Sequence, residues 1–214
     1  MGFEEELNRV LPAGLPRRDI VIVKAAQHLA LIVEANRHFN LTRITEPREA
    51  AIKHILDSVM PWRLFAGARQ VLDAGTGSGF PGIPLALVLP DVRFTLAESV
   101  QKKARFVESA LISLGLPNVA SAARRAEEMV RGPGFDIAFD LITARALAPI
   151  SRALSLFAPA LKARTRVLLY KGPDAEQEIA EAAVEARKRR VRMRIVMRYE
   201  LPDSQGARTI VEIA

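Results

Sequence analysis

The sequence predicts an α/β fold with a mostly parallel sheet of seven strands, an N-terminal helical extension and a C-terminal antiparallel hairpin. Three observations lead to this. Short β-rich runs alternate with helical patterns between about residues 70 and 190, as in sheets that carry helices on both faces. Residues 1–66 contain only helical patterns. Residues 192–214 contain two strand-like runs with no helix between them.

The elements follow from local patterns. In the extension, Ile20 to Glu34 is strongly apolar, and Pro47 opens a second helical segment, as proline does in a first helical turn. Five predicted parallel strands follow at 71–74, 92–98, 118–122, 139–144 and 166–172. The last two runs, 192–201 and 207–214, are joined by the turn-forming sequence PDSQG, and they predict a hairpin at one edge of the sheet. We divide the chain into an extension, residues 1–66, and a main domain, residues 67–214.

Composition sets limits on function. Half of the 214 residues are apolar and 26% are charged, which is typical of globular proteins. The N-terminus does not resemble a signal peptide and no apolar run approaches the length of a membrane span. We therefore expect a cytoplasmic protein without membrane contact. No exposed heptad pattern or surplus apolar helix calls for a second copy, so we expect a monomer.

The counts of reactive residues exclude several chemistries. The chain has no cysteine, which excludes disulfides, thiolate metal sites and cysteine nucleophiles. Its three histidines, His28, His38 and His54, match no short metal-binding motif, and we expect no metal site. The net charge of +7 favours polyanionic partners without identifying one.

The stretch VLDAGTGSGFPGIP, residues 71–84, is the most informative motif. Gly75, Gly77 and Gly79 fall in the turn after the first predicted strand, where open α/β sheets bind ligands. Glycines allow positive φ and a close approach of a ligand to the main chain. Pro81 or Pro84 can begin the next helix. Free N–H groups at that helix start would attract an anion.

The glycine spacing narrows the ligand class. A dinucleotide fingerprint needs a third glycine where this chain has Phe80, and no Gly-Lys-Ser/Thr follows to make a Walker phosphate loop. The acidic residue that ends the second predicted strand is Glu98, in position to accept hydrogen bonds from a ribose diol. Together these features describe an adenosine ligand with a small charged group. S-adenosylmethionine fits this description better than a dinucleotide.

Several motifs in consistent order resemble one family. VLDAGTGSGFPGIPLAL, together with Asn40-Leu41-Thr42, HILDS (54–58), LITARALAP (141–149) and LLYKG (168–172), is similar to the glucose-inhibited division protein B family, also called RsmG. The resemblance implies a Rossmann-like class I methyltransferase that uses S-adenosylmethionine. It also implies N7 of a guanine in bacterial 16S ribosomal RNA as acceptor, and that RNA or the small ribosomal subunit as partner.

The resemblance also assigns residues to the cofactor pocket: Gly75, Phe80, Ala126, Glu127 and Arg145. Arg145 ends the fourth predicted strand, where a fixed cation would meet the methionine carboxylate or the RNA. It is the one side chain we consider for a catalytic role. Guanine N7 carries a lone pair and loses no proton on methylation, so no general base is expected and positioning should dominate. Many family members have Asp where this chain has Glu98.

Basic residues near the predicted site suggest an RNA-binding face. Lys102 and Arg105 lie three residues apart in the helix after Glu98, where cations oppose the helix dipole, so that either RNA phosphates or water must favour them. Lys171 of LLYKG is the third RNA-binding candidate. The basic tract 185–198 ends a helix that begins with glutamates, a gradient that suits the dipole without RNA.

Three other functions remain open on the residues alone. The chain could methylate a protein or a small molecule, since it contains no recognised RNA-binding module. It could be a nucleotide-binding regulator without turnover. A nicotinamide-dependent dehydrogenase is disfavoured by the glycine spacing.

Overall fold

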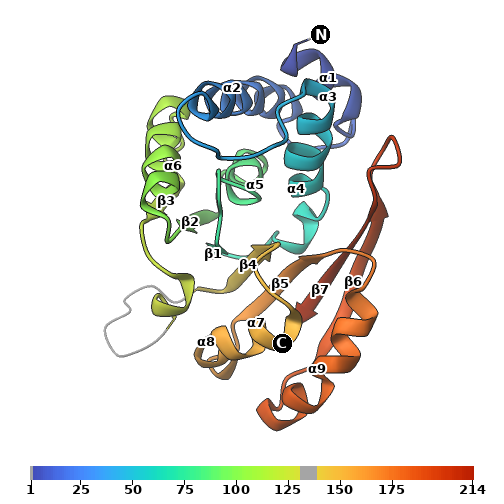
Figure 1. The fold of residues 1–214 in the computed structure, drawn as a ribbon. Helices are drawn as coiled ribbons and strands as arrows, with labels where there is room; N and C mark the ends of the chain where they lie inside the picture. The colour runs from blue at the N-terminus through green and yellow to red at the C-terminus, as the bar shows by residue number, and fades with distance from the viewer. Residues whose placement is uncertain (1, 131–138) are drawn as a thin grey trace.

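The computed structural model describes residues 2–130 and 139–214. Its centre is one seven-stranded sheet with the order β3-β2-β1-β4-β5-β7-β6 (Figure 1). β1 to β5 are parallel, whereas β7 runs antiparallel to both β5 and β6. The strands are β1 Gln70–Ala74, β2 Arg93–Ala97, β3 Val119–Ala122, β4 Leu141–Arg145, β5 Arg166–Lys171, β6 Met193–Glu200 and β7 Ala207–Ile213. All seven predicted strands and the terminal hairpin are confirmed.

The strand order locates the site. From β1 the chain proceeds outward to β2 and β3, and then crosses back to β4 on the other side of β1. The order therefore reverses between β1 and β4. In open parallel sheets, the crevice outside the carboxyl ends of such strands is where ligands bind. The glycine turn follows β1 and Arg145 ends β4, so both lie at this crevice.

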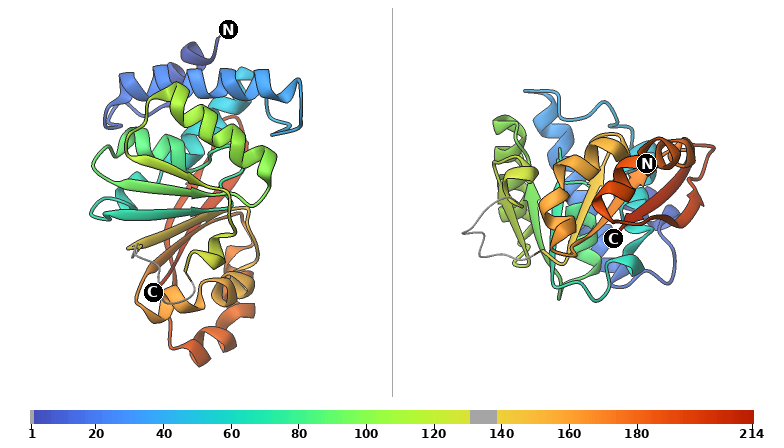
Figure 2. Two further views of the ribbon diagram at one scale, coloured as in Figure 1. Left: turned by 90° about the vertical axis from the view of Figure 1, so that its left-hand side faces the viewer. Right: turned by 90° about the horizontal axis from the view of Figure 1, so that it is seen from below.

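Helices cover both faces of the sheet (Figures 1 and 2). One face packs against the N-terminal helices, α5 and α6, and the other against α7, α8 and α9. Successive residues of β1 show the alternation, because Val71 belongs to the first core and Leu72 to the second. The longer helices are α1 Phe3–Val10, α2 Arg18–Asn36, α5 Gly82–Val88, α6 Gln101–Leu114, α7 Ile150–Leu156, α8 Ala158–Lys162 and α9 Ala175–Arg189. None in the described ranges is long and apolar enough to cross a membrane.

The N-terminal extension shares its core with the sheet. Leu29 and Ile32 of α2 are buried in the same cluster as Phe94 and Leu96 of β2. Burial of each such side chain contributes about 1.5–3 kcal/mol. The extension is thus packed as part of the fold, and the boundary near residue 66 stays a prediction.

The second predicted helix of the extension is divided, which the sequence pattern did not show. It consists of α3 Pro47–Ala50, a π-helical segment η1 Ala51–Leu56 and α4 Asp57–Val59, followed by the 3₁₀ turn η2 Trp62–Leu64. The N–H of Asp57 donates to the carbonyl of Ile52, five residues back, so it does not use the carbonyl of Lys53. That carbonyl accepts instead from Arg145 Nη1 at 2.8 Å. π-helical segments are rare in proteins, and those that occur are often found at functional sites.

The shared core gives a first prediction. Leu29→Ala removes a side chain that is 1% exposed and should lower the free energy of unfolding by about 2–5 kcal/mol. Ile20→Ala on the same helix removes a side chain that is 44% exposed and should change it by no more than about 0.5 kcal/mol. Urea unfolding of both variants measures the difference. Equal effects would mean that α2 does not share the core of the sheet.

Candidate functional site

The glycine turn after β1 has the backbone that the sequence predicts. Gly75, Gly77 and Gly79 have φ of 71°, 62° and 100°, values that favour glycine. Their surroundings differ. A Cβ on Gly75 would lie 2.8 Å from Leu147 Cδ1, and one on Gly79 would lie 2.5 Å from Ile83 Cδ1, whereas nothing lies within 4 Å at Gly77. Gly77 is therefore the point where the main chain borders open space and a ligand has room to approach.

A buried carboxylate, Asp73 at the end of β1, fixes the shape of this turn. Its Oδ2 accepts hydrogen bonds from Thr76 Oγ1 at 2.6 Å and from the N–H of Gly82 at 2.9 Å. Its Oδ1 has no partner among the described residues. Burial raises the pKa of Asp73 to about 6, against the lowering effect of these two hydrogen bonds.

Gly82 in FPGIP is a fourth important glycine, one that the sequence analysis did not single out. A Cβ there would lie 2.1 Å from Leu96 Cδ2 and 2.7 Å from Asp73 Oδ2, so α5 can approach β1 and β2 only without a side chain at this position. The prediction of free N–H groups at this helix start was wrong. The N–H of Gly82 donates to Asp73, that of Ile83 donates to the Gly79 carbonyl, and proline has none.

Glu98 follows β2 and faces the turn. It is only 7% exposed. Its Oε2 accepts from the N–H of Gly77 at 3.1 Å and its Oε1 from the N–H of Val100 at 2.8 Å. A carboxylate offers about four acceptor positions, so the side chain retains acceptor capacity for two sugar hydroxyls. Together with the open space at Gly77, this arrangement fits the ribose of an adenosine ligand.

The other predicted cofactor residues lie around the same end of the sheet. Ala126 and Glu127 form a short 3₁₀ turn, η3 Ala126–Glu128, that lies close to β1. Ala126 is buried in the same cluster as Ala97. Glu127 is half-buried, with Oε1 3.9 Å from Arg125 Nη1. Their assignment to the adenine stays a prediction.

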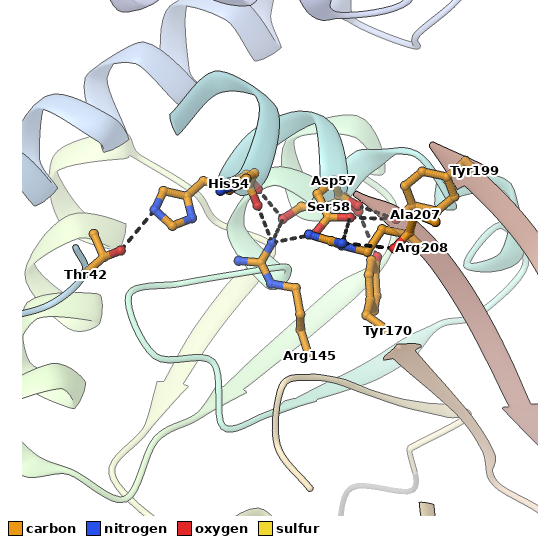
Figure 3. A network of polar contacts seen from close by, with 10 residues as sticks. Thr42, His54, Asp57, Ser58, Arg145, Tyr170, Tyr199, Ala207 and Arg208 are labelled. Carbon is orange, nitrogen blue, oxygen red and sulfur yellow. Dashed lines mark hydrogen bonds and ion pairs between the residues drawn. The ribbon is translucent and has the colours of Figure 1, made fainter. Parts of the chain in front are cut away.

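Arg145 at the end of β4 lies in a network of polar contacts (Figure 3). Besides the Lys53 carbonyl, its Nη1 lies 3.3 Å from Asp57 Oδ2, and its guanidinium lies 5.3 Å from the centre of the Phe80 ring. Its side chain is 18% exposed. Arg145 is thus held in place by the protein and still borders the crevice.

Phe80 is buried between two histidines. The Phe80 ring centre lies 4.9 Å from that of His28 and 4.5 Å from that of His54, and the latter pair is parallel within 6°. Burial lowers the pKa of His28 to about 4, and burial together with the charge of Arg145 lowers that of His54 to about 3. Both rings are therefore neutral near pH 7. Within the described ranges, no cluster of three His, Asp or Glu side chains could hold a metal ion.

The structure separates the three RNA-binding candidates. Lys102 and Arg105 are exposed on the first turns of α6, which begins just after Glu98. Lys171 is different, because its Nζ donates to the Ala148 carbonyl at 2.9 Å and lies 2.7 Å from Glu178 Oε2, and its side chain is 11% exposed. An RNA contact by Lys171 would require these bonds to open. All three remain predictions.

The site also contains residues that the sequence analysis did not assign. A cavity of about 420 Å³ lies at the ends of β4 and β5, lined by residues that include Lys53, His54, Asp57, Arg145, Tyr170 and Arg208. His54 and Asp57 belong to HILDS, a motif we used only for its resemblance. No local sequence pattern pointed to Arg208, because its partner Asp57 is distant in the sequence.

The buried state of Asp73 gives a second prediction. Its folded-state pKa of about 6 lies above the ordinary value of 3.8 for this group, so the folded protein binds the proton more tightly and loses stability as pH rises through this range. Relative to Asp73→Asn, the free energy of unfolding of the original protein should fall by about 2–3 kcal/mol between pH 4 and 7. Urea unfolding across this range measures it. Asp91→Asn, at an exposed position, is the control, and parallel curves for both variants would contradict the prediction.

Comparison with known proteins agrees with this geometry. The family model described as rRNA small subunit methyltransferase G (GidB) matches residues 21–205. A ribosomal RNA small subunit methyltransferase G from Solibacter usitatus is 67% identical over 213 residues, covering 100% of both chains. The protein of that name from Sorangium cellulosum is 42% identical over 188 residues, covering 85% of this chain and 76% of its own length.

Solved structures agree on the fold. An O-methyltransferase from Bacillus cereus in complex with SAH has a TM-score of 0.58 at 19% identity, over 88% of this chain and 90% of its own. The O-methyltransferase TomG from Streptomyces achromogenes in complex with SAM has a TM-score of 0.56 at 20% identity, over 87% and 88%. These matches show that the chain has the Rossmann-like fold of class I methyltransferases. With a family model matched along most of its length and a relative similar from end to end, the chain belongs to the ribosomal RNA small subunit methyltransferase G (GidB) family.

Proposed function

We infer that this protein transfers a methyl group from S-adenosylmethionine to N7 of a guanine in bacterial 16S ribosomal RNA. The observation that carries the proposal is membership of the family, with a relative of that name similar over the whole chain. The site supports it, because the turn at Gly77 and the carboxylate of Glu98 fit an adenosine ligand.

S-adenosylmethionine supplies a methyl group on a sulfonium, from which it can be displaced. In our proposal, Glu98 accepts hydrogen bonds from the ribose and the main chain at Gly77 approaches the ligand, while Gly75 and Gly79 supply the positive φ that shapes the turn. Ala126 and Glu127 border the adenine. Arg145 and Phe80 lie between this pocket and the cavity at β4 and β5.

The chemistry of N7 suits these residues. The nitrogen already carries a lone pair, so the protein has to align acceptor and donor rather than remove a proton. His28 and His54 are buried and neutral, and the alignment relies on fixed groups such as Arg145. N7 lies in the deep, narrow major groove of paired RNA, so the target guanine has to be unstacked or in an irregular loop.

The partner is 16S ribosomal RNA or the small ribosomal subunit, which the protein meets as a monomer in the cytoplasm. Lys102 and Arg105 extend from α6 beside Glu98, so a phosphate bound there would bring the RNA to the mouth of the cofactor pocket.

Methyl transfer tests the proposal directly. The purified protein, with labelled S-adenosylmethionine, should place label on guanine N7 of unmethylated 16S ribosomal RNA or small subunits, as shown by nucleoside analysis. Arg145→Ala should lower the rate about a hundredfold because it removes a fixed positioning group, while Arg152→Ala, at an exposed position, should leave it unchanged. Unfolding curves establish that both variants are folded. Label on protein, or on any other atom of the RNA, would reject the proposal.

The RNA-binding face gives a further prediction. Each phosphate contact contributes about 0.7–0.9 to the slope of log affinity against log salt. Lys102→Ala combined with Arg105→Ala should weaken binding of 16S ribosomal RNA and reduce this slope by about 1.4–1.8. The matched control is Arg187→Ala with Lys188→Ala, two exposed residues at the end of α9. If the control pair changes the slope and the first pair does not, the RNA contacts lie on the α9 side.

A further inference from the structure

A histidine occupies a position of α2 where the helix otherwise buries apolar side chains. His28 is 0% exposed and lies on the same face as Ala25 and Ile32, three residues before it and four after it. α2 packs against α5 and α6, and α5 is the helix that follows the glycine turn. A polar side chain buried among apolar ones costs free energy unless it is hydrogen-bonded. The hydrogen bond that His28 makes goes to the glycine turn.

This bond joins His28 Nε2 and the carbonyl oxygen of Ser78, which lie 2.8 Å apart. A carbonyl oxygen only accepts, so Nε2 donates and carries the hydrogen. Burial lowers the pKa of His28 to about 4, so the ring is neutral near pH 7 and its one N–H is at Nε2. Nδ1 is then a bare acceptor, and it makes no hydrogen bond within the described part of the chain. The main chain of the turn thus determines which nitrogen is the donor.

The bond fixes one peptide unit of the turn, the unit between Ser78 and Gly79. Its carbonyl accepts from His28, and its N–H donates to the Thr76 carbonyl at 3.0 Å. Gly79 has a φ of 100°, but glycine adopts positive and negative φ about equally readily. The glycine itself therefore does not hold the turn in one conformation. Contacts from outside the turn have to select it.

The ring of His28 also packs against the turn. A Cβ on Gly79 would lie 3.1 Å from His28 Cε1, and the ring centre of His28 lies 4.9 Å from that of Phe80. At the start of the same segment, the N–H of Gly77 donates to Glu98 Oε2 at 3.1 Å. Residues 77–80, which border the open space at Gly77, are thus held by Glu98 after β2 and by His28 from the N-terminal extension.

We propose that His28 is a positioning residue for the methyl donor: through the Ser78 carbonyl, it holds the glycine turn in the conformation that receives S-adenosylmethionine. A turn that is fixed before the ligand arrives loses less conformational freedom on binding, which raises affinity. His28 acts through the turn and not by contact with the ligand. The proposal rests on the methyl donor of the proposed function and is independent of the atom that accepts the methyl group.

Two substitutions separate the hydrogen bond from the space that the ring fills. His28→Leu keeps a buried apolar side chain and removes the donor, whereas His28→Gln keeps an N–H for the Ser78 carbonyl. Calorimetry with S-adenosylhomocysteine should show an affinity about tenfold lower for His28→Leu, as for loss of one buried hydrogen bond, and within about threefold of the original for His28→Gln. The matched control is Leu29→Ala, the next residue of α2 and also buried. It lowers stability and should leave the affinity unchanged.

Kinetics give a readout that a general loss of stability does not change. For His28→Leu, KM for S-adenosylmethionine should rise about tenfold, while kcat at saturating donor and KM for the RNA should change by less than about twofold. Urea unfolding establishes that each variant is folded under assay conditions. Equal affinities of His28→Leu and Leu29→Ala, or no recovery with His28→Gln, would overturn the proposal.

The test distinguishes this inference from the proposed function. If the protein binds S-adenosylmethionine and does not methylate guanine N7, the proposed function fails, and the calorimetric affinities still decide the role of His28. If it methylates guanine N7 and His28→Leu binds the cofactor as tightly as Leu29→Ala does, only the present inference fails.

A measurement on the unchanged protein covers the case in which His28→Leu does not fold. The chain has three histidines, so the ¹⁵N signals of its imidazoles can be assigned. His28 should carry its hydrogen on Nε2, and S-adenosylhomocysteine should slow exchange of that hydrogen with solvent about tenfold or more, because a ligand that binds the fixed turn opposes its opening. A hydrogen on Nδ1, or exchange that S-adenosylhomocysteine does not slow, would overturn the proposal.

Discussion

The buried carboxylate of Asp57 is the group on which the arrangement of the site depends. Its side chain is 3% exposed, and a charge so deeply buried is tolerated only when it is paired and hydrogen-bonded. Arg145 and Arg208 each lie 3.3 Å from it, and the hydroxyl of Tyr199 donates to its Oδ1 at 2.9 Å. These partners, drawn in Figure 3, come from β4, β7 and β6. One carboxylate thus joins the N-terminal extension, the centre of the sheet and the terminal hairpin.

The same network explains why the extension contains a π segment. The altered hydrogen-bond register frees the Lys53 carbonyl, and Arg145 uses it together with Asp57. The Nη1 group of the guanidinium is therefore held by two acceptors before any ligand arrives, which lowers the entropic cost of positioning a reactant. The network also affects the phenol of Tyr199, whose hydroxyl donates to this carboxylate. Burial, with the charge of Asp57, raises the pKa of Tyr199, so its hydroxyl keeps its proton and remains a donor.

The sequence predicted those features that local pattern controls. Strands buried on both faces read as short apolar runs, and the glycine turn and Glu98 follow such runs directly. It did not predict the π segment, because helical periodicity does not show a change from i→i−4 to i→i−5 bonding. The pairing of Asp57 with Arg208, 151 residues apart, depends on the topology of the whole sheet. Gly82 was missed for a similar reason, since its constraint comes from Leu96 on a neighbouring strand.

The buried carboxylate of Glu98 connects the glycine turn with the helix α6. This carboxylate accepts a hydrogen bond from the N–H of Gly77 in the glycine turn and another from the N–H of Val100 at the start of α6. The turn and the helix are thereby joined through one buried group. Because Lys102 and Arg105 lie on the first turns of that helix, the carboxylate proposed to bind the cofactor ribose also holds the start of the helix proposed to carry the basic face. In our proposal, a shift of Glu98 would therefore displace both the ribose and the helix that carries Lys102 and Arg105.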